Sequence, residues 1–100
     1  MLPEFKMTAV ISFAHVTKDE AEILNEATEF PIQGQICDGH GTMLYLPPDR
    51  APKEFQEIFV DLGLRVETAN LFQVLALAGA HYLILDSDGP VVDGWETFDW

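Results

Sequence analysis

The stretch Thr8-Ala-Val-Ile-Ser-Phe-Ala-His-Val16, followed at once by Thr17-Lys-Asp-Glu20, decides how the fold begins. Its first part is rich in β-branched and aromatic side chains, which is typical of a strand buried on at least one face. Thr17 and Glu20 then have the spacing of a capping box, in which a hydroxyl and a carboxylate accept hydrogen bonds from free amides at a helix start. We therefore predict a strand over residues 8–16 that leads directly into a helix over about 18–29.

The rest of the pattern predicts two short strands, two helices and a last strand. The short strands, at residues 33–38 and 42–46, flank a glycine-rich turn. A helix from Pro52 repeats apolar residues at i, i+3, i+4 and i+7. The helix at residues 66–78 has almost no polar face, so we expect it to be the most buried one, and residues 80–85 read as a core strand. This order predicts an α+β two-layer sandwich, a mostly antiparallel sheet of three or four strands packed with about three helices.

Length and composition indicate one folded domain over residues 1–100. The chain has 100 residues, of which 48% are apolar, too many for an acidic disordered tail. Cys37 is the single cysteine, so no internal disulfide can form. Residues 7–16 are too short and too polar for a membrane helix and lack the features of a secretory signal. We expect a cytoplasmic protein.

Charge is the strongest indication of function. Seventeen acidic residues against five basic ones give a net charge of −12. Such a chain repels nucleic acid and anionic membrane and is attracted to basic surfaces. On the first predicted helix, the acidic residues Asp19, Glu22, Glu26 and Glu29 fall within a narrow arc. This acidic stripe is either a solvated helix face or a row of carboxylates that imitates phosphates and binds the Arg/Lys groove of a nucleic-acid-binding protein.

Two other groups of residues could carry chemistry. The turn Asp86-Ser-Asp88-Gly89 could hold a hard cation with oxygen ligands, although Asp and Gly also fit an ordinary turn. Cys37, Asp38 and His40 lie close together in sequence, with His15 and His81 elsewhere. A zinc site would need one Cys and three scattered His to converge. A Cys–His nucleophile is disfavoured because Cys37 and His40 flank one tight turn, where alternation aims side chains to opposite faces. No phosphate-binding loop, dinucleotide fingerprint or hydrolase motif is present. We therefore predict no catalytic residues, no metal and no cofactor.

The C-terminal stretch Tyr82-Leu-Ile-Leu-Asp-Ser-Asp-Gly-Pro-Val-Val-Asp-Gly94, with the closing Phe98-Asp-Trp100, resembles a family of small uncharacterised proteins. Its members are about this long and occur on bacterial plasmids, integrative elements and phages. The early segment Ile11-Ser-Phe-Ala-His-Val-Thr17 is similar to that family's opening strand and helix cap. The resemblance implies a genetic setting rather than a reaction, and mobile elements of this kind often encode short acidic inhibitors of host defence systems.

These observations lead to one expected function and two alternatives. We expect a non-enzymatic interaction module that binds a basic protein surface, with the acidic stripe as its main contact. A second acidic and aromatic patch comprises Asp86, Asp88, Asp93, Trp95, Asp99 and Trp100, whose tryptophans either close the core or anchor a partner. The alternatives are a small metal- or ligand-binding module, enzymatic or not, centred on the Asp86 turn, and a structural subunit such as a homodimer.

Overall fold

The computed structural model describes residues 3–27, 30–36, 41–47 and 50–100, with the backbone alone for 33–36. Its elements, in chain order, are β1 (Thr8–Ser12), the short 3-10 helix η1 (Phe13–His15), α1 (Lys18–Glu26), β2 (Ile32–Ile36), β3 (Gly41–Tyr45), α2 (Pro52–Asp61), α3 (Val66–Leu77) and β4 (Tyr82–Asp86). This is the predicted order of elements. The predicted group Cys37, Asp38 and His40 lies outside the described residues.

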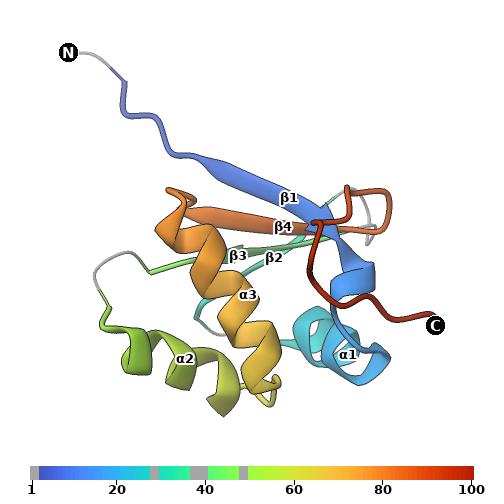
Figure 1. The fold of residues 1–100 in the computed structure, drawn as a ribbon. Helices are drawn as coiled ribbons and strands as arrows, with labels where there is room; N and C mark the ends of the chain where they lie inside the picture. The colour runs from blue at the N-terminus through green and yellow to red at the C-terminus, as the bar shows by residue number, and fades with distance from the viewer. Residues whose placement is uncertain (1–2, 28–29, 37–40, 48–49) are drawn as a thin grey trace.

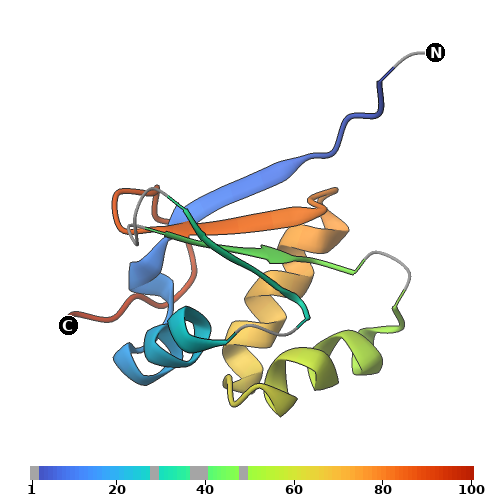
Figure 2. The same ribbon diagram turned by 180° about the vertical axis from the view of Figure 1, so that it is seen from behind.

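The four strands form one mixed sheet in the order β1-β4-β3-β2. β4 and β3 are the two interior strands; β4 is parallel to β1 and antiparallel to β3, and β3 is antiparallel to β2. All three α-helices lie on one side of this sheet (Figures 1 and 2). The predicted class, a small two-layer α+β fold with a mostly antiparallel sheet, is confirmed.

The core fills the space between the sheet and the helices. Alternate strand residues, such as Ile11, Leu44 and Leu83, point into it because successive side chains of a strand face opposite sides. From the helical layer, Phe59 and Phe72 meet edge to face with ring centroids 5.2 Å apart, and both are fully buried. This aromatic contact joins α2 to α3 beneath the sheet.

The opposite face of the sheet carries no helix in the described part of the chain (Figure 2). Register places Val10, Ile84 and Met43 side by side on this face, and Tyr82 beside Tyr45 in the next row. The two tyrosine rings lie 5.5 Å apart. We call these five residues the open face; their side chains are apolar or aromatic and uncharged.

Two element boundaries differ by three residues or more from those expected, and the others by no more than two. The strand predicted over 8–16 ends at Ser12, because the Ser12 hydroxyl accepts a hydrogen bond from the amide of Ala14 at 3.0 Å and starts η1. The helix predicted to reach Glu29 ends at Glu26, because Ala27 takes an extended conformation as its C-cap. Glu29, the last residue of the predicted acidic stripe, lies outside the described residues.

The expectation that the last helix is the most buried holds only for its first half. Thr68, Ala69, Leu71 and Phe72 of α3 are buried, whereas Val74 is 46% exposed and Leu77 is 81% exposed. The C-terminal end of α3 lies by the extended arm before β1, where the Sδ of Met7 would be 3.5 Å from a Cβ added to Gly79. No described element covers Val74 and Leu77, so the apolar pattern overstated the burial.

Candidate functional site

The C-terminal tail, residues 87–100, folds back over the end of β1 and over η1 (Figure 1). Where it crosses β1, the amide of Ser12 donates to the carbonyl of Pro90 at 2.8 Å. Gly89 allows this crossing, because a Cβ there would lie only 2.6 Å from the carbonyl oxygen of Ile11. The tail thus covers the outer edge of β1 at its end.

His15 fastens the middle of the tail with both of its ring nitrogens. The ring is buried, its Nε2 accepts from the amide of Val92 at 2.8 Å, and its Nδ1 lies 3.0 Å from the carbonyl oxygen of Glu96. Since an amide can only donate and a carbonyl can only accept, Nδ1 carries the proton and Nε2 does not. His15 therefore holds the middle of the tail in place by accepting one hydrogen bond and donating another.

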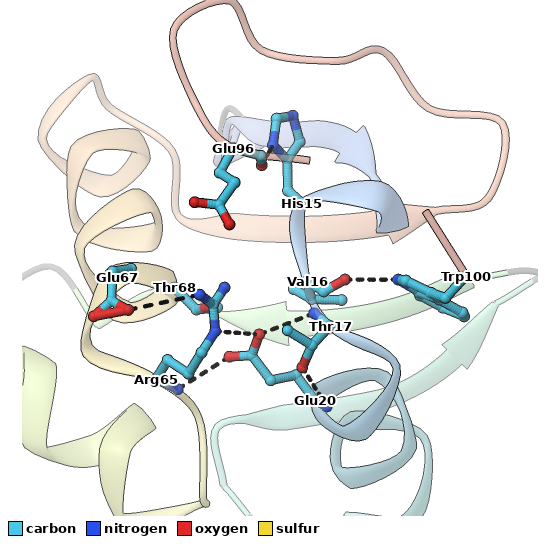
Figure 3. Close-up of polar contacts among 9 residues, drawn as sticks. All are labelled: His15, Val16, Thr17, Glu20, Arg65, Glu67, Thr68, Glu96 and Trp100. Carbon is cyan, nitrogen blue, oxygen red and sulfur yellow. Dashed lines mark hydrogen bonds and ion pairs between the residues drawn. The ribbon is translucent and has the colours of Figure 1, made fainter. Parts of the chain in front are cut away.

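Two further hydrogen bonds fix the end of the tail. The amide of Phe98 donates to the carbonyl of Ala14 at 2.7 Å. The indole Nε1 of Trp100 donates to the carbonyl of Val16 at 2.9 Å (Figure 3). The last residues are therefore held against η1 and the beginning of α1, although Trp100 remains 54% exposed.

Glu20 and Arg65 join three parts of the fold beneath the tail (Figure 3). The capping box is confirmed, because Thr17 and Glu20 exchange both of its hydrogen bonds. The Glu20 carboxylate also accepts from the backbone amide of Arg65 at 3.0 Å and from its Nε at 3.1 Å. The guanidinium then lies 4.6 Å from the centre of the Phe98 ring and donates to the Thr68 hydroxyl.

Opposing influences act on the Glu20 carboxyl. Burial is the largest and favours the neutral acid, but the hydrogen bonds from Thr17, Thr68 and Arg65 favour the carboxylate and together lower the pKa of Glu20 below its ordinary value. Glu20 is therefore ionised at neutral pH. It acts as a structural group between α1, α3 and the tail, and unlike the acids of the stripe it is buried.

A groove lies between α1 and the end of the tail. It has a volume of about 270 Å³ and is lined by side chains that include Phe13, Lys18, Glu22, Asn25, Ser87 and Trp100. A second hollow of about 220 Å³ shares Phe13, Ser87 and Trp100 with it. The α1–tail groove brings together one residue of the acidic stripe, one of the predicted Asp86 turn and the last tryptophan, so both predicted patches meet here.

The acidic stripe is exposed as far as the structure describes it. Asp19, Glu22 and Glu26 are exposed on α1, and none of the ion pairs among the described residues includes them. In the second patch, Asp88, Asp93 and Asp99 are exposed. The two tryptophans differ in burial: Trp95 packs against the core, while Trp100 is exposed to solvent.

The Asp86 turn has the geometry of an ordinary turn. An Oδ1 of Asp86 accepts from the amide of Asp88 at 2.9 Å, which is the local bond expected of an aspartate at this position. Across the described residues, no three His, Cys, Asp or Glu side chains gather as metal ligands. The buried Nδ1 of His81 has no hydrogen-bond partner among the described residues.

Sequence reasoning missed the roles of His15 and Arg65. His15 was visible only as a polar residue in an apolar strand, and its partners are backbone groups of residues 92 and 96. Arg65 carried one signal, as the last basic residue before a long acidic stretch.

No helix in the part of the chain that the structure describes is long and apolar enough to cross a membrane.

Fold and site together define a small acidic α+β domain closed by its own C-terminal tail. A protein-family model described as "Family of unknown function (DUF5983) C-terminal domain" matches residues 8–100. The chain belongs to this family, which confirms the resemblance to a family of uncharacterised proteins. Searches of curated proteins and of solved structures found no significant match.

Proposed function

We propose that this domain is a non-enzymatic interaction module whose acidic α1 face binds a basic surface on a partner protein. The observation that carries the proposal is the exposed row of Asp19, Glu22 and Glu26 on α1, without a cationic partner among the described residues. Like charges three and four residues apart destabilise a helix by a few tenths of a kcal/mol per pair. A basic partner would remove this repulsion.

The partner that fits best is a protein with an Arg/Lys groove for nucleic acid. The three carboxylates extend over about 10 Å of helix, given a rise of ~1.5 Å per residue, and present negative charge on a rigid scaffold much as a phosphate backbone does. Direct binding to nucleic acid or to anionic membrane is disfavoured by the net charge of −12. With the mobile-element setting that the resemblance implies, we propose an inhibitor of host defence or nucleic-acid-handling proteins in the bacterial cytoplasm.

Affinity capture with charge-reversed variants tests this proposal. The immobilised wild type, a D19K/E26K variant and an E54K/E57K variant are compared in bacterial lysate at low and high salt. Glu54 and Glu57 are exposed on α2, and Glu54 lies in the first turn of α2 as Asp19 does in α1. Both variants therefore change the net charge equally, but only one changes the acidic stripe.

The expected result is a specific basic protein that is retained by the wild type and the α2 variant, released by salt and lost with the α1 variant. A partner retained equally by all three proteins would refute a role for the stripe. Equal loss with both variants would show that only overall charge matters.

A small-ligand module centred on the Asp86 turn is the second candidate function. It is favoured by the position of Ser87, which lines both the α1–tail groove and the neighbouring hollow. Thermal unfolding with Mg²⁺, Ca²⁺ or Zn²⁺, in the wild type and in D86N, tests it, because asparagine retains the oxygen that accepts from Asp88 but loses the charge. A metal-dependent rise in Tm that D86N abolishes would support this function; no rise would refute it for these ions.

Self-association is proposed through the open face, whose five side chains carry no charge in a chain of net charge −12. Light scattering after size exclusion would show a dimer that Val10→Asp converts to a monomer. A monomer at all concentrations would refute it.

A further inference from the structure

We infer that the α1–tail groove receives one arginine side chain of the partner, stacked on the indole of Trp100 and paired with the carboxylate of Glu22. This inference rests on the proposed function and names the chemistry of its central contact. It makes Trp100 a partner-binding residue because of its place in the groove, whereas the proposed function rests on charge alone.

Trp100 combines exposure with a fixed orientation. The residue is 54% exposed, yet the bond from Nε1 to the carbonyl of Val16 and the bond from the Phe98 amide to Ala14 hold it in place. An exposed tryptophan that is already ordered loses little conformational freedom when a partner covers it. Tryptophan and arginine are the residues most enriched among those that dominate interface energies.

The charges around the groove select a cation. Glu22 lines it, Asp86 and Asp88 flank its Ser87 in sequence, and Asp99 precedes Trp100. Among the described residues that line the groove, Lys18 is the one basic residue, and it is exposed on the first turn of α1. A guanidinium can both stack on the indole and donate two hydrogen bonds to one carboxylate, which an ammonium cannot.

The chain contains the same combination of groups within its own fold. Arg65 lies 4.6 Å from the Phe98 ring centre and donates to Glu20 at 3.1 Å. The α1–tail groove offers Glu22 and Trp100, each two residues further along the same two segments. Thus α1 and the tail already hold one arginine between a glutamate and an aromatic ring.

The size of the groove favours one side chain over a larger ligand. Its volume of about 270 Å³ lies just below the range of small-molecule sites, which is roughly 300–1,000 Å³. A single extended arginine anchored in the groove leaves Asp19 and Glu26 of the acidic stripe available for neighbouring basic residues of the partner.

NMR titration with blocked peptides tests the inference directly. The probes are acetyl-Gly-Gly-Arg-Gly-Gly-amide and the same peptide with lysine or citrulline in place of arginine. We expect the arginine peptide to shift the indole Nε1–H signal of Trp100 and the amide of Glu22. The lysine peptide should bind at least fivefold more weakly, and the citrulline peptide should cause no shift.

Variants locate the contact. Trp100→Ala should weaken arginine-peptide binding at least tenfold and Glu22→Gln at least threefold, whereas Glu57→Gln and Trp95→Phe should leave it unchanged. Because Trp100→Ala could also loosen the tail, the Phe98 amide signal reports whether the tail stays in place. Glu22→Gln tests the same contact without touching the tail.

Equal binding by the wild type and Glu22→Gln, shifts spread over α2, or equal shifts with the citrulline peptide would overturn the inference. These outcomes are separable from failure of the proposed function. If α1 charge reversal abolishes capture of a partner while the groove variants change nothing, the groove inference alone fails. If charge reversal also changes nothing, the proposed function fails.

Discussion

Replacing Glu20 with alanine gives the sharpest test of how the tail and helices are joined. The side chain is 3% exposed, and its carboxylate accepts from the amides of Thr17 and Arg65 and from the Arg65 guanidinium. Loss of the capping-box bond from the Thr17 amide to the Glu20 carboxylate costs about 1 kcal/mol, while the Thr17 hydroxyl still caps the helix. Each further bond to a charged group is worth roughly 1.5–3 kcal/mol. The exposed part of Arg65 can be rehydrated, so we discount its share and expect a total loss of about 3 kcal/mol.

The effect depends on pH with a definite sign. Because the folded state lowers the pKa of Glu20, the stabilisation is present above the ordinary value near 4.5 and is lost as the pH falls through the lower folded value. The difference in unfolding free energy between wild type and Glu20→Ala should therefore be full at pH 7 and shrink at pH 3. The remainder at pH 3 reports the lost packing and neutral hydrogen bonds.

Urea unfolding followed by circular dichroism measures this difference. For a domain of this size, about 3 kcal/mol corresponds to a fall in Tm of roughly 15 °C. Glu22→Ala, on the exposed face of the same helix, is the matched control and should change stability by less than about 0.5 kcal/mol. A Glu20→Ala protein as stable as this control, or a difference that does not decrease in acid, would refute the assignment of Glu20 as a structural carboxylate.

Three other predictions concern the tail and the core. Gly89→Ala places a Cβ 2.6 Å from the Ile11 carbonyl oxygen and should destabilise the domain by about 1–3 kcal/mol. Faster hydrogen exchange at the Ser12 amide would show that the damage lies where the tail crosses β1, and unchanged exchange would contradict this prediction. His15→Ala removes two hydrogen bonds to the tail, each worth about 1 kcal/mol before the cost of the cavity is added. It should expose Trp95, which a red shift of Trp95 fluorescence in a Trp100→Phe background would show. An unshifted spectrum would contradict the role of His15 in holding the tail. Phe59→Ala removes a fully buried ring that contacts Phe72 and should cost about 3–5 kcal/mol in urea unfolding; a cost below about 1 kcal/mol would place Phe59 outside the core.

Local sequence signals predicted the elements well because their causes are local. The capping box at Thr17 and Glu20 starts α1 where expected, and Pro52 starts α2. The periodic apolar residues Phe55 and Phe59 of α2 are buried as their spacing predicts. The end of α1 was placed too late, since nothing in the polar sequence at 27–29 forbids a further helical turn.

Features that depend on distant parts of the chain could not be read from the pattern. The parallel pairing of β1 with β4 joins residues more than seventy positions apart, such as Thr8 and Tyr82. The partners of His15 and Trp100 are backbone carbonyls and an amide, which every residue type offers. For the same reason the α1–tail groove, which Glu22 and Trp100 both line, becomes visible only in the folded chain.

The most direct test of the central claim is the salt dependence of binding to the captured partner. Titration calorimetry would measure Kd for the wild type, D19K/E26K and E54K/E57K at several salt concentrations. If the acidic α1 face is the binding surface, Kd for the wild type should rise at least tenfold between low and moderate salt, and only the α1 variant should lose binding. A Kd that is independent of salt, or equal for the two variants, would contradict the account.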